Sequence, residues 1–280
     1  MKSNEPKISF SDKNFTWQDG KNWFNQGIIF FKLVKNMWYV SCLVMGVLFL
    51  LLASVALPLV AVLVIFASPM VTAFIMNCCQ AVRLGQPLQI NMLWQDVFKQ
   101  LNYFLLLGLF SALLSMVMQQ VHVLLLSAYE LPLEMTEEMA MNMSGAEALL
   151  RVLFNLITNL PVALALAFSP ALILFKRAHP VNAIKFSVLA VLRSWKAFIA
   201  LVLLIVLVFF GVLILASIVG SVVLMVMGSA GQLVANVLVL FFVFTVTGIG
   251  LCSQYQAFTE LFADDEQEPE SEDTEVYAEI

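Results

Sequence analysis

Charge is scarce in this sequence. Only 12% of its 280 residues are Asp, Glu, Lys or Arg, whereas 61% are hydrophobic and the mean hydropathy is +0.93. Soluble domains carry about twice this share of charge, and a soluble protein this apolar would expose large hydrophobic patches and aggregate. The composition excludes an ordinary soluble protein and favours a chain whose solvent is the lipid bilayer.

Residues for catalysis and metal binding are scarce too. The chain has two His, and none of the apolar runs long enough to span a membrane contains Asp or Glu. It has no phosphate-binding loop, no His-Glu-x-x-His and no Gly-x-Ser-x-Gly motif. General acid–base catalysis therefore lacks candidates. We expect a non-enzymatic protein with no catalytic, cofactor-binding or metal-binding residue, no cofactor and no nucleic-acid partner.

The cysteines do not form a recognisable site. Cys42, Cys78, Cys79 and Cys252 lie inside or beside apolar runs, and their spacing matches no zinc motif. We predict that they act as small apolar packing residues.

What the sequence does contain is a series of long apolar runs. A helix needs about 20 apolar residues to cross the hydrocarbon core. The stretch from Met37 to Val82 carries no charge and is long enough for two spans, with a turn near Pro58. We predict six transmembrane helices, at about 37–55, 58–79, 101–126, 149–175, 197–227 and 232–256.

The predicted fold is an all-α, polytopic membrane protein with interfacial amphipathic helices. Residues 1–36 form a cytoplasmic N-terminal segment with an aromatic interfacial helix, and residues 37–257 form the six-helix domain. Residues 258–280 form an acidic tail. The last eighteen residues hold nine of the 19 acidic side chains and no Lys or Arg, a composition that predicts disorder.

The basic residues predict the orientation. In the six-helix arrangement, 13 of the 14 Lys and Arg lie before the first span, between the second and third, or between the fourth and fifth. Only Arg151 lies on the other side, where Glu residues are common. Since cytoplasmic loops carry the excess of Lys and Arg, both termini are predicted to be cytoplasmic.

Three segments have the pattern of helices lying at the membrane surface. Apolar residues recur at helical spacing in 90–101 and in 184–195, with polar residues on the other faces. The stretch from Trp17 to Trp38 is similar, with Trp23, Phe24 and Phe31 among its aromatic anchors. Each segment could instead be the beginning of the following span.

The spacing of prolines predicts a parallel internal repeat of residues 58–126 and 149–227. Pro69 and Pro161 each precede a basic loop start, a loop proline, an amphipathic stretch and a new span. Pairing Ser68-Pro69 with Ser169-Pro170 is an alternative. If the repeat holds, the spans with Pro69 and Pro161 pack centrally and face protein, because lipid cannot satisfy freed carbonyls. The first and last spans are then peripheral.

Several short motifs resemble a known family. They are Trp17, Trp23, Gly27 and Trp38, then Ser68-Pro69, then Arg83-Leu84-Gly85-Gln86-Pro87. The pattern covers most of residues 15–260 and is similar to an uncharacterised family of six-pass proteobacterial inner-membrane proteins. This resemblance implies a bacterial inner (plasma) membrane location, and it brings no activity, cofactor or site residue with it.

A few residues merit attention individually. His122 and Arg151 lie near the outer ends of their predicted spans, where His122 could bind a metal or simply make an interfacial hydrogen bond. Met135, Met139, Met141 and Met143 lie together in an outer loop. Thioethers suit Cu(I), but a Met-rich segment that packs on the bundle fits the same pattern.

The sequence leaves two functions open. The first is a non-enzymatic inner-membrane protein that acts through partners or lipid, the partner being a second copy or another membrane protein. The alternative is a small permease for an uncharged or apolar solute. A polar cavity around Pro69 and Pro161 would favour the permease, whereas a solid apolar bundle would favour the first function.

Overall fold

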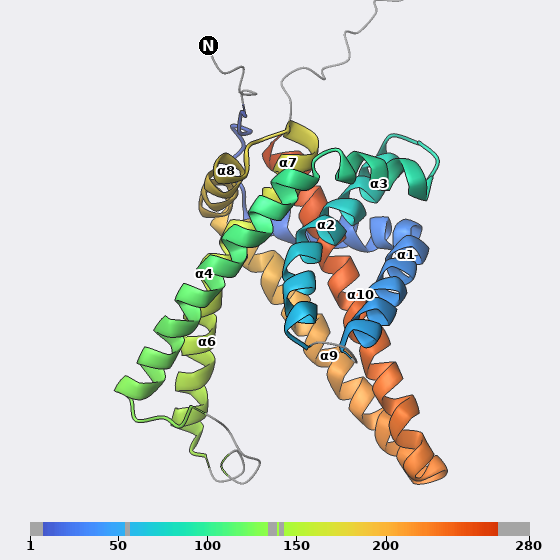
Figure 1. Cartoon of the computed structure of the whole chain (residues 1–280), viewed down its shortest axis with the longest axis vertical. Coiled ribbons are helices and arrows are strands. Elements are labelled where there is room, and N and C mark those ends of the chain that lie inside the picture. Colours follow the sequence, from blue (N-terminus) through green and yellow to red (C-terminus); the bar gives the residue numbers. More distant parts are fainter. Residues whose placement is uncertain (1–7, 54–56, 134–138, 140–142, 263–280) are drawn as a thin grey trace, which may run out of the picture.

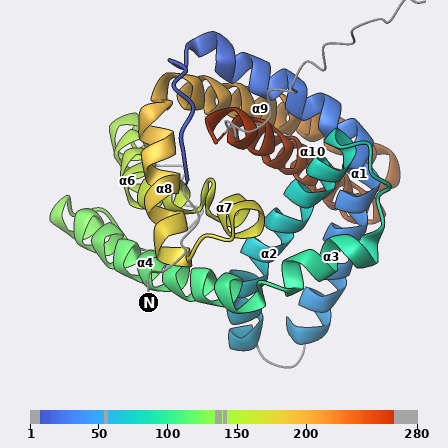
Figure 2. The same cartoon turned by 90° about the horizontal axis from the view of Figure 1, so that it is seen from above.

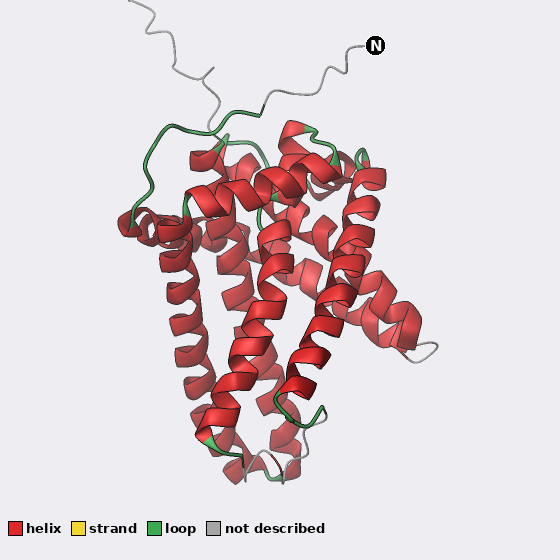
Figure 3. Ribbon diagram, turned by 90° about the vertical axis from the view of Figure 1, so that its left-hand side faces the viewer, coloured by secondary structure: helices red, strands yellow, loops and turns green. Residues whose placement is uncertain are grey.

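The computed structural model describes residues 8–53, 57–133, 139 and 143–262, and the elements in these ranges are helices. Figure 3 shows that the helices are joined by loops at the upper and lower ends of the molecule. Within the described residues, five helical segments are long and apolar enough to cross a membrane. The chain is therefore an all-α, polytopic membrane protein.

The first helix is longer than predicted. α1 (Trp17–Ala53) is continuous, so the expected surface stretch and the first span form one helix. Its first half lies across the upper end of the molecule before the helix turns downward (Figure 1). The expected anchors Trp23, Phe24 and Phe31 are buried in the core. The aromatic pattern therefore reflects packing against other helices as well as closeness to the surface.

α2 (Leu57–Arg83) lies at the centre of the upper half. It contacts α1, α3 (Ile90–Phe98), α4 (Leu101–Ala128), α7 (Ser169–Lys176) and α10 (Ser229–Leu261). Pro69 is buried within it. The central position of α2 agrees with the expectation that the span containing Pro69 faces protein.

The predicted fourth span is broken. The structure has α6 (Gly145–Leu166) and then α7, separated by Ala167 and Phe168. Pro170 causes this break, because proline lacks an N–H and its ring clashes with the carbonyl four residues earlier. Pro161 lies inside α6 and does not end that helix. The predicted span at 149–175 is therefore present, as the candidate segment Gly145–Lys176, but its helix is interrupted rather than continuous.

The second half of the chain follows the predicted order. α8 (Pro180–Arg193) matches the amphipathic stretch after the broken helix, as α3 matches the earlier one. α9 (Trp195–Met227) and α10 form a hairpin whose turn is Gly228, with φ +59°. α10 continues to Leu261, past the predicted start of the tail at residue 258. The rest of that tail, from residue 263, lies outside the described residues.

The core lies at the upper end, where both ends of the described chain are found. Figure 2 shows α7 inside a ring formed by the other helices. Below this level the α4–α6 pair and the α9–α10 pair diverge (Figure 1), and their outward faces carry exposed Leu, Val and Phe. Such faces suit contact with lipid.

α1 and α10 pack closely against each other, although most residues in the spanning part of each helix are not buried. The peripheral position expected for the first and last spans stays a prediction. Gly27 of α1 lies against Ser253 of α10, where an added Cβ would come within 2.0 Å of the Ser253 Oγ. Gly248 of α10 leaves room for Trp38, whose Nε1 donates to the carbonyl of Phe244 at 2.7 Å. These small residues let the two backbones approach closely.

Candidate functional site

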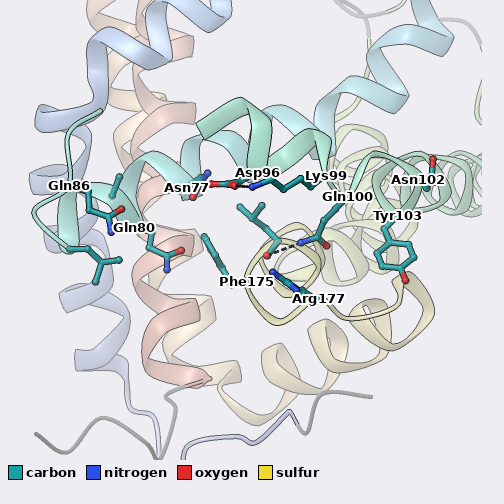
Figure 4. Close-up of a pocket in the computed structure, with 13 residues that line it drawn as sticks. Asn77, Gln80, Gln86, Asp96, Lys99, Gln100, Asn102, Tyr103, Phe175 and Arg177 are labelled. Carbon is teal, nitrogen blue, oxygen red and sulfur yellow. Dashed lines mark hydrogen bonds and ion pairs between the residues drawn. The ribbon is translucent and has the colours of Figure 1, made fainter. Parts of the chain in front are cut away.

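A polar pocket of about 850 Å³ opens at the upper end of the molecule between α2, α3, α4 and α7. Five of its lining side chains are amides: Asn77, Gln80, Gln86, Gln100 and Asn102. Figure 4 shows Gln80 and Gln86 on one side, and Gln100, Asn102 and Tyr103 on the other. Since an amide both donates and accepts hydrogen bonds, this lining suits a polar ligand.

The wall formed by α3 is fixed to α2. The Asn77 Nδ2 donates to the carbonyl of Leu93 at 3.1 Å. Trp94 stacks on Phe74 of α2, with ring centroids 4.4 Å apart and an interplanar angle of 11°. Leu93 and Val97 are buried on the same face of α3. The amphipathic pattern of this short helix thus holds it against α2 and positions its polar face toward the pocket.

Gln100 connects the opposite walls. It precedes α4, and its Nε2 donates to the carbonyl of Leu174 in α7 at 3.0 Å. Its Oε1 is buried and has no hydrogen-bond partner among the described residues. A buried acceptor without a partner costs about 1–3 kcal/mol, so this oxygen favours a ligand that brings a donor.

Two cations and one carboxylate line the pocket. The Lys99 Nζ lies 2.7 Å from the Asp96 Oδ1, and both side chains are largely exposed. Arg177 follows α7 with φ +50°, a left-handed conformation that Gly or Asn usually adopts at a helix end. It forms no ion pair within the described part of the chain. This conformation is strained for a residue other than glycine.

Part of the pocket lining is apolar. Leu84, Leu174 and Phe175 line the pocket together with the polar groups. The site therefore combines a guanidinium and an ammonium group, several amides and a hydrocarbon surface. This combination can bind a molecule that is polar at one end and apolar at the other.

The residues that the sequence analysis singled out do not line the upper pocket. The His122 Nδ1 is 3.4 Å from the Thr158 Oγ1, between α4 and α6. Arg151 donates to the carbonyl of Pro132 near the lower end. Three of the cysteines are buried and Cys42 is half-buried, in keeping with a packing role.

The methionine cluster falls partly outside the described residues. Met135 and Met141 are not described, whereas Met139 is exposed and Met143 is half-buried. Among the residues that are described, no three His, Cys, Asp or Glu side chains come together in a metal-binding arrangement. Copper binding by the methionines stays a prediction.

Sequence reasoning missed the upper pocket. A signal was present, because eight Asn and Gln residues occur between positions 77 and 102 of a chain that is otherwise poor in polar groups, and five of them line the pocket. Nothing in the sequence indicated that Leu174 to Arg177 would lie opposite them.

Searches against protein-family models, curated proteins and solved structures find no match. The resemblance to the six-pass inner-membrane family therefore stays a prediction. What the helices show by length and composition is an integral membrane protein with several spans.

Proposed function

We propose that this protein is non-enzymatic and binds the polar head group of a membrane phospholipid in the upper pocket. The single observation that carries the proposal is the lining of that pocket. Arg177 and Lys99 suit a phosphate, since guanidinium and ammonium groups both bind phosphate oxygens. The amides suit hydroxyl or amine groups of the head group, and Phe175 and Leu174 suit the beginning of an acyl chain.

The proposal includes six spans and an orientation. α2, with 27 residues, is the sixth span beside the five candidate segments. Lys13, Lys99, Arg177 and Arg193 belong to the segments at the upper end, whereas Arg151 contacts Pro132 near the lower end. The positive-inside rule then supports a cytoplasmic upper end with both termini. The inner membrane of a bacterium is the proposed location.

The orientation is tested with reporter fusions. A reporter that is active only outside the cytoplasm should be active when fused at Glu138 and silent when fused after Phe262. The reverse pattern, or activity at both sites, would contradict the six-span arrangement.

Head-group binding is tested by the phospholipid retained after purification in mild detergent. Arg177→Gln and Gln100→Leu each remove one binding group. Since a hydrogen bond to a charged group contributes about 1.5–3 kcal/mol, Arg177→Gln should weaken retention about tenfold or more. Lys185→Gln is the matched control, because Lys185 is exposed on α8 and does not line the pocket. Equal retention by all three variants would refute the proposal.

A second candidate, a small permease for an uncharged solute, has its own support. The break between α6 and α7 is buried in protein around Phe168 and Ser169. Broken helices of this kind form binding sites and hinges in transporters, where irregular backbone is tolerated inside the membrane. Solute uptake by liposomes that contain the purified protein would favour this candidate over a purely lipid-binding role.

Association with a second copy or another membrane protein remains part of the proposal. The mass of the protein in mild detergent, together with whatever co-purifies, would test it. A monomer with bound phospholipid alone would support the lipid-binding role without a protein partner.

A further inference from the structure

A second polar site lies far from the upper pocket, in the seam between α4 and α6. It is a groove of about 290 Å³. Six of its lining side chains are polar: Ser115, Gln119 and His122 from α4, and Asn155, Thr158 and Asn159 from α6. It shares no lining residue with the upper pocket.

The groove lies at the depth of the hydrocarbon core. α4 has 28 residues, and Ser115 is at its midpoint. With a rise of about 1.5 Å per residue, Ser115 is about 20 Å from either end of the helix. Gln119 is one turn farther along. Uncompensated polar groups at this depth are costly, because lipid offers no hydrogen bonds.

Most exposed side chains on the other side of each helix are apolar, with Gln120 of α4 as an exception. Leu109, Leu113 and Met116 are exposed on the other side of α4. Leu156 and Leu160 are exposed in the same way on α6. Each span therefore has an apolar face suited to lipid and a polar face that contributes to the groove.

Only some of the polar groups that line the groove have hydrogen-bond partners within the protein. The Thr158 Oγ1 donates to the carbonyl of Phe154 at 2.8 Å. The Asn159 Nδ2 donates to the Asn155 carbonyl at 2.8 Å and lies 3.1 Å from the Asn155 Oδ1. Among the described residues the amide of Gln119 has no hydrogen-bond partner. Donors and acceptors thus remain for a ligand.

We propose that the α4–α6 groove binds a small, uncharged polar molecule of the polyol or simple amide class. The lining contains no carboxylate, Lys or Arg, so it offers no opposite charge to an ion at this depth. An acyl chain would leave the amide of Gln119 without a partner.

The test is cysteine labelling of the full chain in liposomes. Asn159→Cys is made in a Cys42→Ala background, because Cys42 is the one native cysteine that is not fully buried. Leu160→Cys is the matched control, since the neighbouring residue is exposed on the apolar face. A water-soluble methanethiosulfonate is added with glycerol, urea or sodium chloride. The reagent needs a thiolate, which forms only where water reaches the thiol.

The cysteine at 159 should react at least about tenfold faster than the cysteine at 160, since only the groove admits water. Glycerol or urea should slow the labelling several-fold, whereas sodium chloride should not. Gln119→Leu, added to Asn159→Cys, should reduce that protection without lowering the melting temperature. This pattern would support the site.

Three outcomes would overturn it. Fast labelling that neither glycerol nor urea slows would mean a water-filled groove that binds neither class. A disulfide-linked dimer on mild oxidation would mean that a second copy covers the groove. Equally slow labelling at both positions without a dimer would mean that lipid covers it. None of these outcomes bears on phospholipid retention in the upper pocket, so the two proposals fail separately.

Discussion

The hydroxyl of Ser187 donates to the carbonyl of Leu164 across 2.7 Å. The same oxygen accepts from the backbone N–H of Phe168 at 2.9 Å. One side chain of α8 thereby satisfies two backbone groups at the break between α6 and α7. Ser187 is fully buried, so these two backbone groups depend on its hydroxyl and not on water for their hydrogen bonds.

Ser187→Ala should destabilise the protein by about 1–3 kcal/mol, because it leaves a buried N–H and a buried carbonyl without their partner. The melting temperature in detergent would measure this. Ser217→Ala is the control, since the Ser217 hydroxyl is exposed and bonds only to the Leu213 carbonyl of its own helix. Equal melting temperatures for both variants would show that the break does not depend on Ser187.

Gly27→Ala should separate α1 from α10. The new methyl group would lie 2.0 Å from the Ser253 Oγ and 2.7 Å from the Ser253 backbone nitrogen, which cannot move aside alone. Overpacking of this kind costs about 1–3 kcal/mol, occasionally more. Gly46→Ala, which meets nothing within 4 Å, should melt like the parent protein. A Gly27→Ala protein as stable as the Gly46→Ala protein would contradict the packing of these two helices.

Cys79 and Cys252 should be crosslinkable. Their Sγ atoms are 3.5 Å apart in the contact between α2 and α10, and a disulfide needs about 2.05 Å. A shift of about 1.5 Å therefore allows the bond. Both thiols are fully buried, so prolonged oxidation at alkaline pH is used, which lets transient opening expose them as thiolates. Cleavage between the two residues and gel electrophoresis should then reveal a linked pair, and Cys42 should remain free. Linkage of Cys42 instead would place these helices differently.

The N-terminal segment, residues 8–16, should detach from the rest of the protein at alkaline pH. The Lys13 Nζ lies 2.7 Å from Asp19 and 3.2 Å from Glu260. The hydrogen bond to Asp19, opposed in part by burial, raises the pKa of Lys13 above its ordinary 10.5. Because the folded-state pKa is the higher one, the stabilisation is complete below about pH 10.5 and is lost as the pH rises through the folded-state value.

Limited proteolysis of residues 8–16 across this pH range would measure the release. Lys13→Met should expose the segment at every pH, whereas Lys21→Met should retain the alkaline step. A segment that stays protected in Lys13→Met would show that other contacts hold it, such as that of Phe10 with Phe262.

Much of this fold follows from local pattern. Hydropathy alone locates the spans that became α4, α9 and α10, because each apolar run is long enough to cross the bilayer. α3 and α8 follow from apolar residues at helical spacing. These features depend on near neighbours in the chain, which the sequence displays directly.

The predictions that failed concern features that depend on contacts between residues far apart in the sequence. Pro161 and Pro170 look alike in the sequence, but only Pro170 lies where Ser187 of another helix can satisfy the opened backbone. Trp23 looked like an interfacial anchor, but it is completely buried in the core, with its ring against Phe15. The upper pocket escaped prediction because its lining comes from parts of the chain that only the fold brings together.

The backbone N–H of Ser11 donates to the carbonyl of Leu261 at 3.0 Å, and this contact has a consequence for how the protein is made. A ribosome adds about 5–20 residues per second, so about 12–50 s separate the synthesis of these two residues. During that interval the early segment has no α10 to bind. The upper end can therefore close only after the last helix has left the ribosome, and until then nascent chains should leave residues 8–16 open to chaperones and proteases.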